Sequence, residues 1–317
     1  MTIPKVFDSG KSETSVAVIL AFFNGAKWIE AQLESIKNQI QTNIDVYIFD
    51  DCSDGSESIK LREIVKKYSI VKKVTFRNQR LGYAKNFLNG LQGISNQYSY
   101  YCFSDQDDIW LPTKLSRAIN HLKKIEGQAG ALYGARTMVC DADANSIEPS
   151  RYFERKPCFE NAIIQNIIGG NTIVFDHILK QKITELIFDE VVSHDWMLYQ
   201  LATGCGASVI YDEVPTVLYR QTDANVIGGN LKPWRYLSSF LRLVSGEVKL
   251  SVDSHIKILL ANASLLSNEP LILLRAFEAA RRGTFINRLH FLFHFKIFRQ
   301  GRFENIVILL AFIFCRA

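Results

Sequence analysis

The chain is 317 residues long, carries a formal net charge of +5, and is 48% hydrophobic and 22% charged, with 18 glycines and 7 prolines. These values are typical of one large or two average globular domains, and they exclude disordered, collagen-like and miniprotein classes. The charge is uneven, because residues 231–317 contain 13 Lys and Arg against 5 Asp and Glu. Residues 1–230 are therefore net acidic, and the basic character belongs to the C-terminal end.

The pattern of cysteines and the hydropathy of the chain indicate the cellular compartment in which the protein is expected. The six cysteines are scattered without a C-x-x-C pair, which predicts neither a disulfide framework nor a zinc site and favours a reducing compartment. Residues 1–14 lack the apolar segment of a signal peptide. The most apolar run, residues 306–315, is half the roughly 20 residues that a spanning helix needs. We therefore expect a cytoplasmic protein without a transmembrane helix.

The first half of the chain alternates between two patterns. Short β-prone runs are each followed by apolar residues at helical spacing. The expected strands are 16–21, 45–49, 74–76 and 98–103, and the expected helices are 29–40, 61–68, 83–91 and 115–122. This alternation predicts an α/β fold with a doubly wound, mainly parallel sheet flanked by helices.

The regular alternation of predicted strands and helices ends after Gly130. Short strands at 131–133, 137–140 and 172–175 are mixed with helices, which predicts a mixed sheet that extends the parallel one. Beyond Pro233 the pattern is helical and rich in Leu, Phe, Arg and His. We expect one catalytic domain over residues 1–230 and a basic helical C-terminal region over residues 231–317.

Two acidic loops follow expected strands. Residues 49–56 read F-D-D-C-S-D-G-S and residues 103–110 read F-S-D-Q-D-D-I-W. Ligands of open α/β sheets bind at the carboxyl ends of the strands. An Asp-x-Asp there suits Mg²⁺ or Mn²⁺ shared with a phosphate, which indicates a nucleoside diphosphate. The alternative is that these aspartates only form turns and cap the following helices.

Other nucleotide and hydrolase signatures are absent from the sequence. No G-x-G-x-x-G follows the first strand, and no G-x-x-x-x-G-K-[ST] occurs. The G-x-S-x-G element of a serine hydrolase is also missing. Dehydrogenase, P-loop and serine hydrolase functions are therefore not supported.

Five motifs in register resemble family 2 glycosyltransferases of the GT-A fold. They are A-V-I-L-A-F-F-N-G at 17–25, F-D-D-C-S-D-G-S at 49–56, N-x-x-x-G-x-x-x-N at 78–86, F-S-D-Q-D-D-I-W at 103–110 and S-H-D-W at 193–196. The resemblance covers about residues 14–230. The fourth motif is similar in particular to bacterial rhamnosyltransferases that build O-antigens and capsules.

The resemblance implies roles for four residues on the donor side. Asp51 matches the aspartate that binds the nucleobase, and Phe23 stands where a tyrosine commonly stacks on that base. Asp107, supported by Asp105, matches the Asp-x-Asp that holds Mn²⁺ or Mg²⁺ on the donor diphosphate. Such a cation would neutralise the departing nucleotide.

Asp195 matches the catalytic base of the family. The resemblance implies that it deprotonates the acceptor hydroxyl, which attacks the anomeric carbon opposite the leaving group with inversion of configuration. The alternative for Asp195 is a charge at a helix N-terminus. His194 is expected to be a structural neighbour. Trp110 and Trp196 either shape an acceptor pocket or belong to the core.

One position departs from the family pattern. A histidine that contacts metal or phosphate often follows a Tyr-Arg-x sequence late in the domain, whereas this chain has Thr222 after Tyr219, Arg220 and Gln221. We expect metal binding to depend on the aspartates. Arg220 is expected to supply positive charge to the donor phosphate.

Three functions follow as hypotheses. The first is transfer of L-rhamnose from dTDP-rhamnose to a lipid-linked glycan, and the second is the same reaction with a UDP-hexose donor such as UDP-glucose or UDP-galactose. The third is a non-enzymatic binder of nucleotide sugars or polyanions. A net acidic body argues against a nucleic-acid partner. The basic, aromatic C-terminal region predicts peripheral docking on an anionic membrane, with packing of its helices on the catalytic domain as the alternative.

Overall fold

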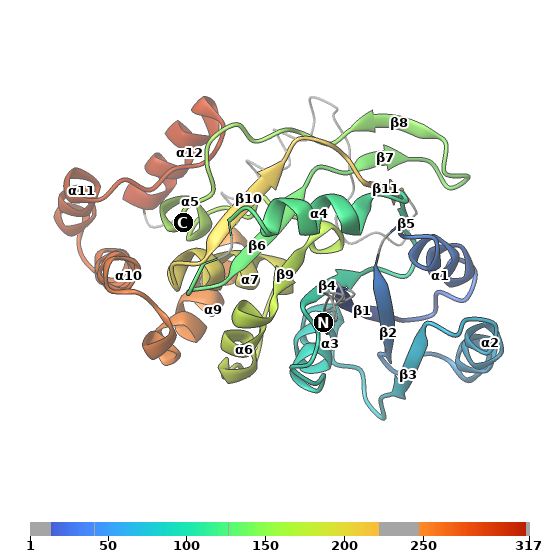
Figure 1. Ribbon diagram of the computed structural model, residues 1–317. Helices are drawn as coiled ribbons and strands as arrows, with labels where there is room; N and C mark the ends of the chain where they lie inside the picture. Colours follow the sequence, from blue (N-terminus) through green and yellow to red (C-terminus); the bar gives the residue numbers. More distant parts are fainter. Residues whose placement is uncertain (1–13, 41, 126, 222–246, 315–317) are drawn as a thin grey trace, which may run out of the picture.

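The computed structural model describes residues 14–40, 42–125, 127–221 and 247–314. A seven-stranded sheet lies between two layers of helices, and a smaller four-stranded sheet lies beside it (Figure 1). The predicted α/β fold with a mixed, mainly parallel sheet and C-terminal helices is therefore confirmed. The expected boundary between residues 230 and 231 lies outside the described residues, so the division into two domains stays a prediction.

The main sheet has the strand order β10-β6-β9-β4-β1-β2-β3. Strand β9 is antiparallel to β4 and β6, and the other neighbours are parallel. The strands are β1 (Ser15–Phe22), β2 (Asn43–Asp50), β3 (Val71–Phe76), β4 (Tyr100–Ser104), β6 (Ala131–Ala135), β9 (Val174–Asp176) and β10 (Ser208–Asp212).

Both faces of this sheet are covered, which explains why its central strands are continuous apolar runs. Along β1, Val18 and Leu20 point to one face and Ala17 and Ile19 to the other, because side chains alternate along a strand. The first face packs against α1 (Ile29–Lys37), α2 (Gly55–Val65) and α4 (Lys114–Leu122). The second face packs against α3 (Tyr83–Gln92), α5 (Phe159–Ala162), α6 (His177–Glu185) and α7 (His194–Gly204).

The second sheet was not predicted. It has the order β5-β11-β7-β8, from β5 (Ile109–Trp110), β11 (Val217–Arg220), β7 (Met138–Cys140) and β8 (Ser146–Pro149). The expectation that residues 137–140 extend the main sheet is wrong, because β7 pairs with β11 and β8 instead. These strands are two to four residues long and pair across long sequence separations, so local periodicity carries no signal for them.

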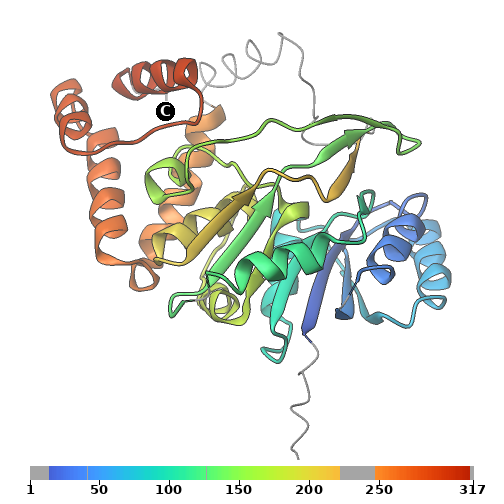
Figure 2. The same cartoon turned by 45° about the horizontal axis from the view of Figure 1, so that its top comes forward.

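The C-terminal helices continue the second hydrophobic layer. They are α9 (Glu247–Ala261), the 3-10 turn η2 (Ala263–Leu265), α10 (Asn268–Arg282), α11 (Phe285–His294) and α12 (Arg302–Ile313). Figures 1 and 2 show them at the end of the molecule opposite α1 and α2. Within them, the rings of Phe277 and Phe312 stack with centroids 5.3 Å apart. Among the described residues, no helix combines the length and the hydropathy needed to cross a bilayer.

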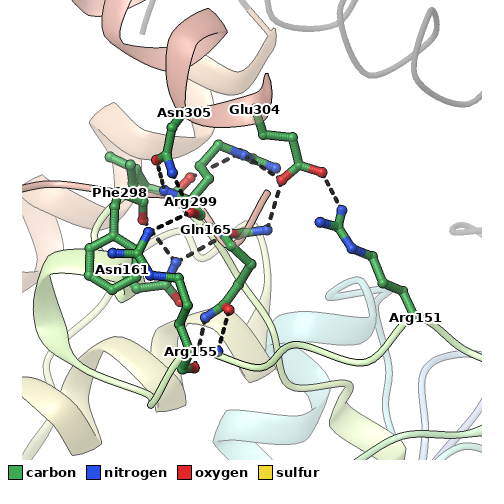
Figure 3. A network of polar contacts seen from close by, with 10 residues as sticks. Arg151, Arg155, Asn161, Gln165, Phe298, Arg299, Glu304 and Asn305 are labelled. Atoms are coloured by element: carbon green, nitrogen blue, oxygen red, sulfur yellow. Dashed lines mark hydrogen bonds and ion pairs between the residues drawn. The ribbon is translucent and has the colours of Figure 1, made fainter. Parts of the chain in front are cut away.

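A polar network joins the segment before α12 to the segment around α5 (Figure 3). The side-chain amide of Asn161 donates to the carbonyl oxygen of Phe298 at 2.9 Å, and the backbone amide of Gln300 donates to Gln165 Oε1 at 2.8 Å. Gln165 Nε2 also donates to Glu304 Oε2 at 3.4 Å. The C-terminal helices thus pack on the rest of the chain through polar as well as apolar contacts, as the packing alternative predicted.

Candidate active site

A cavity of about 680 Å³ opens at the carboxyl ends of β1, β2 and β4. Because these parallel strands are neighbours, the loops that follow them meet at one edge of the sheet. The cavity wall includes five of the six predicted site residues, namely Phe23, Asp51, Asp105, Asp107 and Asp195. The sixth, Arg220, is outside this wall.

Asp51 follows β2 and is held by the loop before α3. Its Oδ1 accepts a hydrogen bond from the Leu81 amide at 2.7 Å, and its Oδ2 accepts one from the Gly82 amide at 2.8 Å. Gly82 has a φ of 81°, a left-handed conformation that favours glycine. Four residues later, Asn86 donates to the carbonyl oxygen of Phe49 at 2.8 Å. The spacing of Gly82 and Asn86 therefore has a structural reason, since both fasten α3 to the end of β2.

Phe23 is fixed by a side chain from the acidic loop. Gln106 accepts from the Phe23 amide at 2.9 Å through Oε1 and donates to the Phe23 carbonyl oxygen at 3.0 Å through Nε2. Gly25 allows this approach, since a Cβ there would lie 2.1 Å from Gln106 Cδ. On the cavity side, the Arg80 guanidinium lies 3.8 Å from the centre of the Phe23 ring. Phe23 and Arg80 together form a cationic, aromatic part of the wall.

The acidic loop after β4 carries three aspartates. Burial, followed by the charges of Asp108, Asp107 and Asp195, raises the pKa of Asp105 well above its usual value. Burial also raises the pKa of Asp107, and it raises that of Asp108 to about 7. Asp108 accepts from Asn171 Nδ2 at 2.6 Å. Crowded carboxylates with raised pKa values indicate a place where a cation would be stabilised.

This donor set fits a divalent cation only when other ligands contribute. Among the residues that the structure describes, no three His, Cys, Asp or Glu side chains form a cluster that could hold a metal ion. The carboxylate of Asp105 accepts no hydrogen bond from any described residue, so its lone pairs are available to a cation. Mg²⁺ usually takes one or two protein carboxylates and completes its shell with phosphate oxygens and water.

Arg220 supports the acidic loop from β11. Its Nε donates to the carbonyl oxygen of Asp107 at 3.0 Å, its Nη1 donates to that of Ala142, and its guanidinium lies 4.6 Å from the centre of the Trp28 ring. Arg220 is 5% exposed. The structure thus places it behind the loop, and its expected contact with phosphate stays a prediction. Thr222, the departure from the family pattern, lies outside the described residues.

Asp195 occupies the first turn of α7, which begins beside η1 (Gly170–Thr172). Its Oδ1 accepts from the Trp196 amide at 2.7 Å and from the hydroxyl of Ser193, the N-cap residue. Its Oδ2 accepts from the Gly170 amide at 3.1 Å. Hydrogen-bond donors on both oxygens fix the orientation of the carboxylate. Asp195 is therefore a charge at a helix N-terminus, as the alternative states, and it also belongs to the cavity wall.

His194 belongs to the cavity wall but is almost fully buried among aromatic rings. Its ring stacks on Phe87 with centroids 4.2 Å apart and meets Phe103 edge-on at 5.0 Å. Burial lowers the pKa of His194 to about 4, so the ring is neutral at physiological pH. A Cβ on Gly170 would lie 2.5 Å from His194 Nε2, which explains the glycine.

Of the two tryptophans considered for the acceptor pocket, Trp110 is buried and Trp196 is partly buried against the core. Trp110 is 2% exposed, with the Lys114 ammonium 3.6 Å from its ring centre. Trp196 donates through Nε1 to the Ala162 carbonyl oxygen at 2.7 Å and packs on the core. Neither belongs to the cavity wall, so the core alternative is correct for both.

The sequence analysis missed the part of the wall beyond Asp195. This part of the wall is largely apolar and aromatic and includes the basic residue Arg151. Its members include Val139, Arg151, Phe153, Ile167, Ile168, Tyr211 and Tyr219. Tyr211 and Tyr219 lie on β10 and β11, which were not predicted as strands. Arg80 was also missed, although its place between Asn78 and Gly82 in a recognised motif was an available signal.

Comparisons with known proteins agree with the motifs. A family model described as Glycosyl transferase family 2 matches residues 17–184, which confirms the resemblance found in the sequence. The dTDP-rhamnosyl transferase RfbG of Shigella flexneri is 29% identical over 222 residues, covering 67% of this chain and 74% of RfbG.

Two solved structures share the fold at low sequence identity. One is S. aureus TarS 1-349 in complex with UDP-GlcNAc, with a TM-score of 0.54 and 13% identity over 96% of this chain and 90% of TarS. The other is the mannosyltransferase PcManGT from Pyrobaculum calidifontis in complex with GDP-Man and Mn²⁺, with a TM-score of 0.51 and 15% identity over 95% of this chain and 85% of PcManGT.

Proposed function

The chain belongs to glycosyl transferase family 2, and on that premise we propose that it is an inverting, metal-dependent enzyme of bacterial cell-surface polysaccharide synthesis. It transfers L-rhamnose from dTDP-rhamnose to a hydroxyl of a lipid-linked oligosaccharide. The observation that carries the proposal is the single cavity whose wall combines Asp51, Asp105, Asp107 and Asp195. A binder without turnover would not need an oriented carboxylate such as Asp195 beside the acidic loop.

Phe23, Arg80 and Asp51 bind the nucleotide in this proposal. The ring of Phe23 offers a stacking face, and Arg80 brings a positive charge next to it. Asp51 uses one lone pair of each oxygen for the Leu81 and Gly82 amides, which leaves a second lone pair free to accept the imide N–H of thymine or uracil. This recognition selects a base that has a ring N–H donor, as thymine and uracil do and cytosine does not, and it does not distinguish thymine from uracil.

Asp105 and Asp107 would hold the divalent cation, Mn²⁺ or Mg²⁺, that the donor diphosphate requires. When bound, the cation supplies positive charge that stabilises the leaving nucleoside diphosphate. Arg220 holds the backbone of Asp107 in place and keeps a positive charge behind the loop. Burial, followed by the charges of Asp108, Asp107 and Asp195, raises the pKa of Asp105, and a bound cation would favour its ionised form.

Asp195 acts as the general base. Its ionised carboxylate accepts the proton of the acceptor hydroxyl, the hydroxyl oxygen forms a bond to the anomeric carbon, and the bond from that carbon to the diphosphate oxygen breaks. Attack opposite the leaving group inverts the anomeric configuration. The acceptor lies in the apolar, aromatic part of the cavity around Phe153 and Tyr211, since aromatic faces pack well against the C–H faces of sugars.

The choice of dTDP-rhamnose is supported by the fourth motif and by the relative from Shigella flexneri. The alternative is a UDP-hexose, because thymine and uracil differ by one methyl group. A donor panel tests the choice: purified protein is incubated with Mn²⁺ or Mg²⁺ and each nucleotide sugar, and release of nucleoside diphosphate is measured. If nucleoside diphosphate is released fastest from a UDP-hexose, that sugar and not rhamnose is the donor. If no donor releases nucleoside diphosphate, the proposed catalysis is contradicted.

An exposed apolar ridge on α11 and α12 supports a peripheral membrane role. Its members are Phe285, Ile286, Phe293, Phe303, Ile306, Leu310 and Phe314, with exposed fractions between 49% and 87%. Lys296 and Arg302 are exposed beside it, within a region rich in basic residues. Apolar side chains that insert at the interface and cations that attract anionic headgroups together favour docking on a membrane. Docking would bring the cavity close to a lipid-linked acceptor.

A further inference from the structure

His255, on the C-terminal helix α9, is completely buried and lies against the start of α7. Its Nδ1 lies 3.0 Å from Gln200 Oε1, and its Nε2 lies 3.4 Å from the backbone nitrogen of Ser193. The ring also packs on Trp196, with centroids 5.0 Å apart. A residue more than 50 positions away in the sequence thus contacts the N-cap and about the first two turns of α7, the first of which carries Asp195.

The surrounding hydrogen bonds determine the tautomer of His255. Gln200 donates through Nε2 to the carbonyl oxygen of Ala162 at 3.2 Å, so its Oε1 faces the histidine as an acceptor. Nδ1 of His255 therefore carries the proton and donates to Gln200, and the bare Nε2 accepts from Ser193. Burial also lowers the pKa of His255 to about 4, which keeps the ring neutral.

The contact continues to the carboxylate of Asp195. Ser193 is the N-cap of α7, and its hydroxyl donates to Asp195 Oδ1. The Ser193 amide is held by His255, so the histidine limits where the serine hydroxyl can lie. This gives an unbroken path of three hydrogen bonds from Gln200 through His255 and Ser193 to Asp195.

We propose that His255 is a positioning residue for the transfer reaction, which sets the orientation of the Asp195 carboxylate through the backbone and hydroxyl of Ser193. The C-terminal helices then contribute to catalysis and not only to stability. The inference rests on the proposed function, because it takes Asp195 as the base. Near-attack geometry is sensitive to shifts of about 1 Å, so a loose N-cap is expected to lower turnover while leaving donor binding intact.

Two conservative variants separate the two ring nitrogens. In His255→Gln, the side-chain oxygen can occupy the position of Nε2 and accept from Ser193. In His255→Asn, the side-chain amide can reach Gln200 from the position of Nδ1, and the acceptor for Ser193 is lost. We expect His255→Gln to retain kcat within about threefold and His255→Asn to lose about tenfold, with donor KM unchanged in both.

Turnover is measured as nucleoside diphosphate release from the best donor of the panel, with water as the nucleophile, so that no acceptor has to be known. In a Ser193→Ala background, the His255→Asn substitution should cost less than about threefold, because the link to Asp195 is already cut. Equal kcat values for the Gln and Asn variants, or full additivity with Ser193→Ala, would overturn the proposal.

A second readout does not depend on activity. Exchange of the Ser193 amide hydrogen, followed by NMR, should be faster in His255→Asn than in the wild type and restored in His255→Gln. If no donor is turned over but the exchange pattern holds, the proposed function fails while the contact between His255 and Ser193 stands. If Ser193 exchange is unchanged in His255→Asn, the positioning role is refuted whatever the activity.

Discussion

Glu304 of α12 forms an ion pair with Arg151, whose side chain belongs to the cavity wall. Glu304 also lies 3.5 Å from Arg299 Nε, so one carboxylate neutralises two guanidinium groups from different segments (Figure 3). The C-terminal helices therefore contact the cavity wall at Arg151 as well as the N-cap of α7 at Ser193.

The first prediction concerns this ion pair. Glu304→Gln should lower the free energy of unfolding by about 1–3 kcal/mol, because it leaves two partly buried guanidinium groups without a counter-charge. Chemical denaturation monitored by circular dichroism measures the change. Glu154→Gln, at an exposed position, is the matched control and should change stability by less than about 0.5 kcal/mol. Similar losses in both variants would contradict the role of the pair.

The same carboxylate predicts a pH dependence. Burial raises the pKa of Glu304, but the hydrogen bond and charge of Arg151, together with Arg299, lower it further, so the net shift is below the usual 4.5. A depressed pKa in the folded state gives stability above the unfolded pKa that is lost as the pH falls through the folded value. The difference between wild type and Glu304→Gln should thus be full at pH 7 and shrink below about pH 4.5. A difference that stays constant from pH 7 to pH 3 would show that the charge is not responsible.

The second prediction concerns the metal. Asp107→Asn should abolish turnover, and EDTA should do the same to the wild type, reversibly on addition of Mn²⁺ or Mg²⁺. Isothermal titration of Mn²⁺ in the presence of the nucleoside diphosphate should show weaker binding in the variant. Asp143→Asn, on an exposed loop, should behave as wild type. Full activity in EDTA would remove the metal from the mechanism.

The third prediction separates donor binding from chemistry at Asp195. Asp195→Asn should keep donor affinity within a few-fold, because the carboxylate is proposed to contact the acceptor and not the nucleotide. Turnover should fall by roughly 10²–10⁴-fold, the usual loss for a positioned general base. Asp189→Asn, an exposed position shortly before α7, is the control. Loss of donor binding in Asp195→Asn would show that its role is misassigned.

The fourth prediction concerns the apolar ridge. The protein should sediment with vesicles containing anionic phospholipid, and high salt should weaken the association. Phe293→Glu, at an 87% exposed position, should reduce binding several-fold, whereas Ile59→Glu, 63% exposed on α2, should not. Substitution is a sharper test than deletion of residues 284–317, since Phe291, Ile308 and Phe312 are buried in the shared core. Equal sedimentation of both variants would contradict a role of the ridge in membrane docking.

The sequence by itself determined most of the main sheet, the flanking helices of the first half of the chain and most of the candidate site. A strand such as β1 can be predicted from its consecutive apolar residues. Because β1, β2 and β4 are parallel neighbours, Asp51 and Asp105, which follow β2 and β4, lie at the same edge of the sheet. Both inferences use local sequence patterns and the rule that ligands bind at the carboxyl ends of parallel strands, and neither requires knowledge of side-chain packing. The motif around Asp195 was found through its resemblance to the family, and the alternative, a charge at a helix N-terminus, agrees with the position of Asp195 in the first turn of α7.

Only the tertiary structure decided which distant side chains meet these local elements. Arg220 lies behind Asp107 because β11 pairs with β5, a two-residue strand without a periodic pattern. His255 reaches Ser193, and Glu304 reaches Arg151, because the C-terminal helices bury apolar faces on the same layer as α7. The hydrophobic effect does not depend on the orientation or identity of the apolar partner. An amphipathic pattern therefore predicts that a helix buries one face, but it does not identify the element on which that face packs. The partners of these side chains follow from the shape of the whole core.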